Sequence, residues 1–262
     1  MAGDIRNDGQ DAELNAEIGE LVGRLSGDQD MDRETRGRLL GRLARLLSTS
    51  ARRTGATGLA GGRWLTDMFA QVAPRIPVRD LETLRRHHDG LSGERLAEDL
   101  VRGAANATMA VGAAGGALAA VEFVAPPLLL TVPAQLVAES VVVAAIEVKL
   151  IAELHEVYGV QVPGNGTARA GVFLTAWAKQ RGVDPMAGGT LTVALGTAAK
   201  QALRNRLLRL LGRHLTTLGP FLTGAVAGGA LNRMFTKRLA EAVRKDLRRH
   251  LGAIDAPPAS GP

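Results

Sequence analysis

Ionisable residues interrupt one otherwise apolar stretch of the chain, residues 134–158, whose length and composition predict a long helix. They are Glu139, Glu147, Lys149, Glu153, His155 and Glu156. Glu139 and Glu147 are eight residues apart, roughly 80° around a helix, so both carboxylates can border one face. A buried carboxylate needs a cationic partner, for which Arg169 and Arg233 are the candidates. The pattern predicts either a polar cluster inside a bundle, or one structural salt bridge at Glu139 with the last four residues in solvent.

The pair His155-Glu156 suggests zinc, but the surrounding residues do not support a metal site. The motif HExxH needs a second histidine at position 159, which is glycine, and a zinc site needs three or four convergent ligands. His87 and His88 lie beside a predicted helix end, where cations favour the helix dipole. The sequence has no GxSxG, Walker or GxGxxG motif in the context that such chemistry requires. We therefore predict no catalytic residue, metal or cofactor.

Two predicted helices, within residues 198–215 and 234–251, combine a leucine-rich face with basic residues on the opposite side. Such helices bind anionic lipid at about 1 kcal/mol per nearby cation. The alternative is a bundle helix with a solvated charged face. Nucleic acid is disfavoured as a partner, because no aromatic residues are interleaved for base stacking. The candidate lipid contacts are Arg206, Arg209, Arg213, Arg244, Lys245, Arg248 and Arg249.

Charge is unevenly distributed along the chain. Residues 1–30 contain eight acidic and two basic residues, whereas residues 161–262 contain fifteen basic and four acidic residues. The acidic beginning and the basic end can bind each other, or the basic end can face an anionic partner. Most of the basic residues are arginine, which suits phosphate binding but equally reflects a GC-rich genome.

The composition predicts an all-α protein. Aromatic residues make up only 3% of the 262 residues, so the core must consist of leucine, valine and alanine, which favour helices. There is no cysteine, which excludes disulfides and thiolate metal sites. We expect a multi-helix bundle with closely packed, Gly/Ala-rich central helices.

Two GxxxG patterns identify the helix faces that we expect to approach one another. The glycines are Gly112 and Gly116 in one predicted helix and Gly224 and Gly228 in another. A spacing of four residues puts both glycines of a pair on one face, where a neighbouring backbone can come close. Because glycine costs a helix about 1 kcal/mol relative to alanine, close packing is expected to compensate.

The segment 103–146 is apolar enough to raise the question of a membrane hairpin. Residues 103–121 carry no charge, but they are mostly alanine and glycine, a weak signal for insertion. The following segment begins with Pro126, Pro127 and Pro133 and contains Glu139. Helices buried in a protein core have the same composition, and we favour the core over the hairpin.

Breaks in the pattern divide the chain into three parts. Pro74 and Pro77 mark a boundary after an N-terminal helical extension, residues 1–75, and the main helical domain covers 76–251, followed by a disordered tail, 252–262. Within the extension, 1–10 is expected to be disordered and 48–62 to be a loop. Asp80 is predicted to cap one helix and Gly159 to end another.

Residues 76–251 resemble the bacterial EcsC protein family. The resemblance rests on Leu91-Ser-Gly-Glu94 before an Ala/Gly-rich helix, on Val132-Pro133 before the long helix, on Leu154-His-Glu-Val-Tyr-Gly159 at its end, and on Gly228-Gly-Ala-Leu-Asn-Arg-Met-Phe-Thr236. The segment 1–75 is additional to the shared region. The resemblance implies a family without an assigned biochemical role, so it carries no catalytic or cofactor-binding residue to this chain.

The sequence therefore predicts a non-enzymatic helical protein that associates with the inner face of the cell membrane from the cytoplasm. Two alternatives stay open: an integral membrane protein with a hairpin at 103–146, and a soluble scaffold or carrier of a small apolar ligand. No particular protein partner or oligomeric state follows from the residues.

Overall fold

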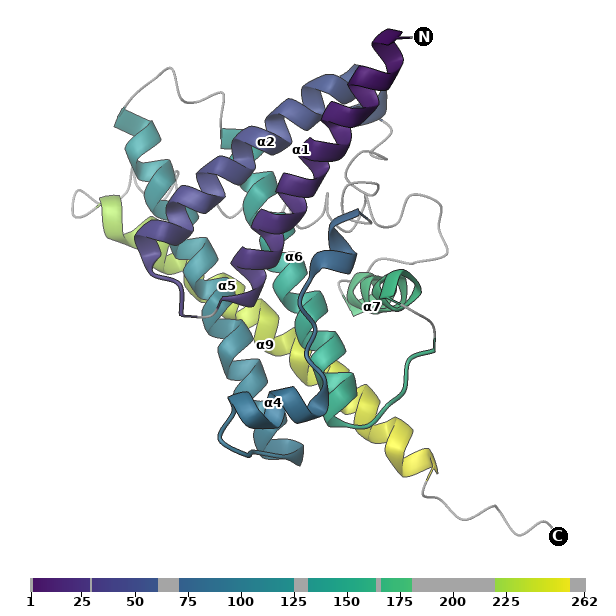
Figure 1. Cartoon of the computed structure of the whole chain (residues 1–262). Helices are drawn as coiled ribbons and strands as arrows, with labels where there is room; N and C mark the ends of the chain where they lie inside the picture. The colour runs from purple at the N-terminus through teal and green to yellow at the C-terminus, as the bar shows by residue number, and fades with distance from the viewer. Residues whose placement is uncertain are drawn as a thin grey trace, which may run out of the picture.

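The computed structural model describes residues 2–28, 30–60, 71–124, 132–163, 166–180 and 220–254. Within these ranges the secondary structure is helical, as the composition predicts, and the helices pack as an all-α bundle (Figure 1). The elements are α1 (Ala2–Gly27), α2 (Arg33–Ala60), the 3-10 turn η1 (Ala73–Arg75), α4 (Leu81–His87), α5 (Gly93–Val124), α6 (Val132–Val157), α7 (Gly166–Gln180) and α9 (Pro220–Ile254).

Helices α5 and α9 form the most extensive helix pair of the described structure. They approach closely at Gly229, where an added methyl group would lie 2.8 Å from the carbonyl oxygen of Met109. Beside this contact, the amide of Asn232 donates to the Thr108 carbonyl at 3.2 Å. The close helix packing expected from glycine is therefore present, one residue beyond Gly228. Of the four predicted packing glycines, Gly112 is buried, and the surroundings of Gly116, Gly224 and Gly228 lie outside the described side chains.

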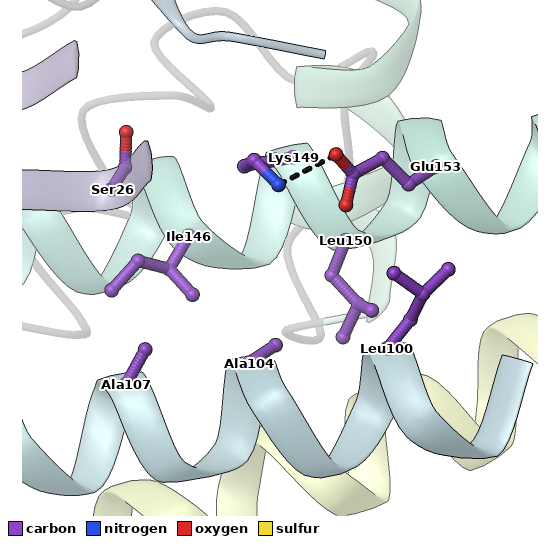
Figure 2. A pocket seen from close by; sticks show the side chains of 8 residues that line it. All are labelled: Ser26, Leu100, Ala104, Ala107, Ile146, Lys149, Leu150 and Glu153. Carbon is purple, nitrogen blue, oxygen red and sulfur yellow. Dashed lines mark hydrogen bonds and ion pairs between the residues drawn. The ribbon is translucent and has the colours of Figure 1, made fainter. Parts of the chain in front are cut away.

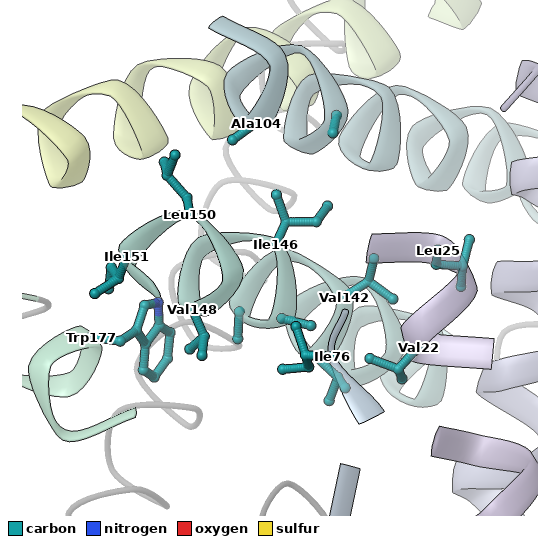
Figure 3. Close-up of a cluster of buried hydrophobic side chains, with 14 of the residues drawn as sticks. Val22, Leu25, Ile76, Ala104, Val142, Ile146, Val148, Leu150, Ile151 and Trp177 are labelled. Carbon is teal, nitrogen blue, oxygen red and sulfur yellow. The ribbon is translucent and has the colours of Figure 1, made fainter. Parts of the chain in front are cut away.

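Helix α6 runs through the middle of the bundle and contacts every other described α-helix. Figure 3 shows its buried side chains among residues of α1, α5 and α7. An unbroken run from Ala144 to Leu154 is buried. A helix that is apolar all round must be covered on all sides, which explains why the predicted long helix lacks a clear polar face. Its buried side chains include Val142, Ile146, Val148, Leu150 and Ile151.

The two N-terminal helices share the hydrophobic core of α5 and α6. Helix α1 contributes Ile18, Val22 and Leu25, and α2 contributes Leu40 and Leu43, all of them fully buried. The leucine face predicted for residues 33–48 is thus the face that packs inward. The segment predicted as an extension is joined to the remaining helices by one continuous core.

Two expectations for this N-terminal segment are wrong. Helix α1 begins at Ala2, where disorder was expected, and α2 continues through residues 48–60, where the Gly/Thr-rich composition predicted a loop. Paired side chains support the extended ends, because Arg53 of α2 contacts Asp11 of α1 with 2.8 Å between Nη1 and Oδ1. Arg42 and Glu17 form a second ion pair between the helices. Antiparallel packing has overridden weak local propensity.

A third glycine series, which the motif search missed, lies on α1. Methyl groups added at Gly19, Gly23 and Gly27 would meet the segment Arg75–Pro77 at 2.5–3.0 Å, and at Gly23 the obstacle is the backbone oxygen of Arg75. The missing side chains allow this segment to approach α1 closely. Four-residue spacing places all three glycines on one face, so the same signal used for the central helices was available here.

Buried Arg36 connects the end of α1 to the beginning of α2. Its guanidinium donates to the carbonyl oxygens of Leu25, Asp28 and Met31 at 3.2–3.5 Å. These carbonyls lie at and beyond the C-terminus of α1, where the helix dipole favours a cation. Burial lowers the pKa of Arg36, and the nearby Asp28 and Asp32 oppose that effect.

The predicted helix boundaries outside the N-terminal segment are confirmed where the structure describes them. The Asp80 carboxylate accepts from the Thr83 backbone N–H at 2.8 Å at the start of α4. Gly159 follows α6 with a φ of 66°, the left-handed conformation that glycine adopts freely. Helix α9 is continuous across residue 232. At the C-terminal end, however, helix α9 continues through residues 252–254, where the disordered tail 252–262 was expected to begin. The rest of that tail and the helix expected over 185–214 lie outside the described residues.

Among the described residues, no helix has both the length and the apolar character needed to span a membrane.

Candidate functional site

The outward face of α9 carries a concentration of positive charge. Lys237, Arg238, Lys245, Arg248 and Arg249 are all exposed. At 100° per residue they fall within an arc of roughly 120°, opposite the side that buries Leu239, Val243 and Leu247. We call these five cations the basic stripe. Only one acid, Glu241, projects from within the same arc.

The predicted lipid contacts on α9 differ in whether they are exposed or held in ion pairs with the rest of the bundle. No described residue forms an ion pair with Lys245, whereas Arg249 pairs with Asp246 of its own helix. Arg248 is 54% exposed and its Nε lies 3.8 Å from Glu94. Arg244, by contrast, is only 13% exposed. The other three predicted contacts, Arg206, Arg209 and Arg213, lie outside the described residues.

Arg244 belongs to a polar clamp that joins α9 to α5 and α6. Its guanidinium pairs with Glu94 of α5, and its Nε donates to the Tyr158 hydroxyl at 3.2 Å. The Tyr158 hydroxyl in turn donates to Glu94 at 2.9 Å. Burial alone would lower the pKa of Arg244, but its hydrogen bonds to Glu94 and Tyr158 raise it overall. Arg244 is therefore held toward the bundle, away from the arc of the basic stripe.

The acidic side chains of α1 that the structure describes form no ion pair with the basic stripe. Described acidic residues of α1, Asp11 and Glu17, pair with arginines of α2 instead. These pairs form because α2 packs against α1 in the core, which places its arginines within reach of the acids of α1. Asp11 and Glu17 are thus neutralised by arginines of the next helix in sequence, and the basic stripe faces outward.

A buried carboxylate, Glu147, lies at the centre of a second polar arrangement. Glu147 of α6 has no exposed surface. One of its oxygens accepts from the indole N–H of Trp177 on α7 at 2.8 Å, and the other accepts from the Thr236 hydroxyl on α9 at 2.9 Å. Thr236 also shares a hydrogen bond of 2.9 Å with Thr108 of α5. This Glu147 network links four helices inside the bundle, where an unsatisfied carboxylate would be costly.

The structure does not gather the predicted buried cluster of Glu139, Glu147, Arg169 and Arg233 around one point. Glu139 accepts from Gln135 one turn earlier on α6, at 3.3 Å. Arg169 donates to the Val162 carbonyl at 3.2 Å, and Arg233 donates to Asn106 at 2.6 Å. Among its described contacts, Glu147 accepts from neutral donors of α7 and α9, which the search for cations did not consider.

Lys149 and Glu153 form a buried ion pair, which corrects the alternative that placed them in solvent. Their Nζ and Oε1 atoms are 2.5 Å apart, and both side chains are more than nine-tenths buried. Burial lowers the pKa of Lys149, and Glu153 opposes that effect. The pair borders a small cavity of about 10 Å³ between α6, Ser26 of α1 and the alanines of α5 (Figure 2), a space that matches one water molecule.

The histidines do not form a metal site within the described structure, where no group of three potential ligands converges. His155 contacts the Ile151 carbonyl through Nδ1 at 2.7 Å and packs edge-on against Phe173, with 5.2 Å between the ring centres. Burial lowers the pKa of His155, with Glu156 among the opposing influences. His88 contacts Asp99 at 2.8 Å between Nδ1 and Oδ2. His155 and His88 thus serve local packing and helix-end contacts.

Sequence reasoning missed the residues that complete both polar arrangements. Thr108, Thr236 and Trp177 carry neutral donors, which a search for charge partners passes over. Glu94 and Tyr158 were quoted only as parts of a resemblance, although they come from segments 64 residues apart that meet in space. A hydroxyl in the middle of an apolar helix face was the one available signal for Thr108 and Thr236.

Comparison with known proteins gives no relative for this chain: no family model matches it, and neither a curated protein nor a solved structure does.

Proposed function

We propose that this protein functions by non-enzymatic association with an anionic membrane surface, through the basic stripe of α9. The observation that carries the proposal is the alignment of five exposed cations on the face of α9 that points away from the bundle. Each cation near an anionic bilayer contributes about 1 kcal/mol. A rigid helix that presents them together needs no reorganisation before it binds.

The chemistry of the interior supports association over catalysis. An enzyme built from the long helix would need Glu139, Glu147, His155 and Arg233 to converge on a cleft. Instead, Glu147 bonds to Trp177 and Thr236, and His155 packs against Phe173. These groups stabilise helix packing from inside the bundle. The resemblance of residues 76–251 to the EcsC family stays a prediction, and the proposal does not depend on it.

Co-sedimentation with lipid vesicles tests the proposal. We expect the protein to sediment with vesicles that contain phosphatidylserine and to remain in solution with pure phosphatidylcholine. Binding should weaken as salt is raised from 0.05 to 0.5 M, because the Debye length shortens from about 14 Å to about 4 Å. Equal recovery with both lipids at low salt would overturn the proposal.

A matched pair of variants locates the binding surface. Changing Lys237, Arg238 and Lys245 to glutamine removes three charges from the stripe, and we expect the partition coefficient to fall by roughly 100-fold, at about 1 kcal/mol per charge. The control changes exposed Arg33, Arg38 and Arg45 of α2 to glutamine, which alters net charge equally. An equal loss in both variants would show that net charge, and not the stripe, governs binding.

Carbonate extraction separates this proposal from the alternative of a membrane hairpin at 103–146. A protein held at the surface by α9 should be released into the supernatant, because a peripheral protein has low affinity for the membrane at high pH. A hairpin would stay with the membrane pellet. Recovery in the pellet after carbonate, with the triple variant behaving as the unaltered protein does, would favour the hairpin.

A further inference from the structure

The basic stripe ends beside two carboxylates of α5. Glu94 and Glu98 are both exposed, Glu98 by 61% of its side-chain surface. Arg248 of the stripe lies 3.8 Å from Glu94, and Arg244 lies 3.7 Å from Glu98. The helix that carries the stripe and the helix that carries the acids are the most extensively packed pair of the described structure, so their relative positions are fixed by the core.

These contacts hold Arg244 more firmly than they hold Arg248. Arg244 is mostly buried and bonded to both Glu94 and Tyr158, so leaving that site would strand a buried polar group. Arg248 is half exposed and contacts Glu94 at the long end of the ion-pair range. An exposed pair of this kind contributes about 0–1 kcal/mol, comparable with the contribution of one lipid contact.

A lipid phosphate and the Glu94 carboxylate are therefore alternative acceptors for the Arg248 guanidinium. Approach of an anionic surface to this end of α9 also brings that surface toward the negative charges of Glu94 and Glu98. Both effects oppose binding, because the two carboxylates offset part of the attraction between the five stripe cations and the surface. Net attraction still grows with the anionic charge of the surface, since the cations outnumber the carboxylates, so binding needs a higher anionic density than the stripe alone would need. The opposing charge lies within a Debye length of the stripe, so salt does not remove it at ordinary ionic strength.

We infer that Glu94 and Glu98 set a threshold of anionic lipid density below which the basic stripe does not bind. This inference rests on the function proposed above and names the class of surface that the stripe selects: bilayers of high anionic lipid content, and not bilayers with a sparse anionic component. The two carboxylates act through Arg248 and through the local potential. Glu94 additionally holds Arg244 in the polar clamp, whereas the described contact of Glu98 is a longer one with Arg244, at 3.7 Å.

Vesicle titration measures the threshold directly. The mole fraction of phosphatidylserine is raised from 5 to 50% at constant salt, and half-maximal binding is compared among the unaltered protein, Glu98→Gln and Glu94→Gln. The control is Glu20→Gln on α1, which changes net charge equally at an exposed site outside the α5–α9 pair. We expect half-maximal binding to move to a lower anionic fraction by about twofold or more in both α5 variants, with little movement in the control.

The outcomes distinguish the two proposals. If the unaltered protein binds anionic vesicles and all three variants shift alike, the threshold is overturned while the proposed function stands. If the unaltered protein binds no anionic vesicle, the proposed function falls and the threshold with it. Because Glu94→Gln also removes a bond to Arg244, the Glu98→Gln variant decides the matter should thermal unfolding show that Glu94→Gln is destabilised.

Discussion

Polar side chains on the two faces of α9 have opposite environments: those facing inward are buried and hydrogen-bonded, and those facing outward are exposed. On the inward face, Thr236 is fully buried, and its hydroxyl is committed to Glu147 and Thr108. On the outward face, the adjacent residues Lys237 and Arg238 are exposed. The comparison teaches that the buried polar groups serve specific helix packing, since each has partners at hydrogen-bond distance, while the outward cations remain available to a partner. Predictions of stability test the first half of this contrast, and predictions of binding test the second.

The largest effect is expected from Trp177 on the inward side. Changing Trp177 to alanine empties a fully buried site and removes the donor to Glu147, so we expect the free energy of unfolding to fall by about 3–5 kcal/mol. Changing Trp177 to phenylalanine keeps most of the packing and should cost about 1–3 kcal/mol for the lost indole donor. Urea unfolding followed by circular dichroism measures both. Equal stability of the phenylalanine variant and the unaltered protein would show that the hydrogen bond to Glu147 contributes nothing.

A smaller effect with opposite signs is expected from two glycines. A methyl group at Gly229 would lie 2.8 Å from a backbone oxygen of α5, so Gly229→Ala should destabilise the protein by about 1–3 kcal/mol through overpacking. Gly41 in α2 has no atom within 4 Å of the same position, so Gly41→Ala should stabilise by about 1 kcal/mol through helix propensity. Thermal unfolding of the two variants compares them. Stabilisation by both changes would contradict the close approach of α5 and α9.

On the outward side, Glu241 is the acid within the arc of the basic stripe. Replacing it with glutamine removes a charge that repels an anionic surface, so we expect vesicle binding to tighten by roughly fivefold, or about 1 kcal/mol. Glu34→Gln, at an exposed position on α2, provides the control for net charge. The free energy of unfolding should be unchanged in both variants. Weaker binding of Glu241→Gln would place the lipid contact elsewhere on the molecule.

The smallest effect is expected from pH acting on His155. Burial lowers its pKa in the folded protein below the ordinary value of 6.5, so the unfolded chain takes up this proton first as pH falls. The stability contributed by neutral His155 is therefore complete above pH 6.5 and declines as pH drops through that value toward the folded pKa. Urea unfolding at pH 7.5 and 5.5 should show this slope, reduced in His155→Gln. An unchanged slope in that variant would assign the pH dependence to other groups.

Much of the helix inventory followed from local sequence signals. Asp80 and Gly159 marked helix ends correctly, since capping depends on only a few neighbouring atoms. The polar cluster was predicted less well: Glu147 was identified as a candidate buried carboxylate, but its donors Trp177 and Thr236 come from α7 and α9. The expected cations, Arg169 and Arg233, contact other groups. Helical periodicity shows which face a residue occupies and not which distant helix covers that face.

The sequence by itself determined that this chain is helical, that its core is built from small and aliphatic side chains, and that its C-terminal helix has a basic side, because composition, capping and periodicity act over a few residues. Tertiary structure decided which charges remain exposed. Arg244 and Lys245 are neighbours of one chemical type, yet Arg244 is clamped by Glu94 and Tyr158 while Lys245 faces outward. The physical reason is that an ion pair forms only where packing brings its partner within reach, and that partner lies 150 residues away.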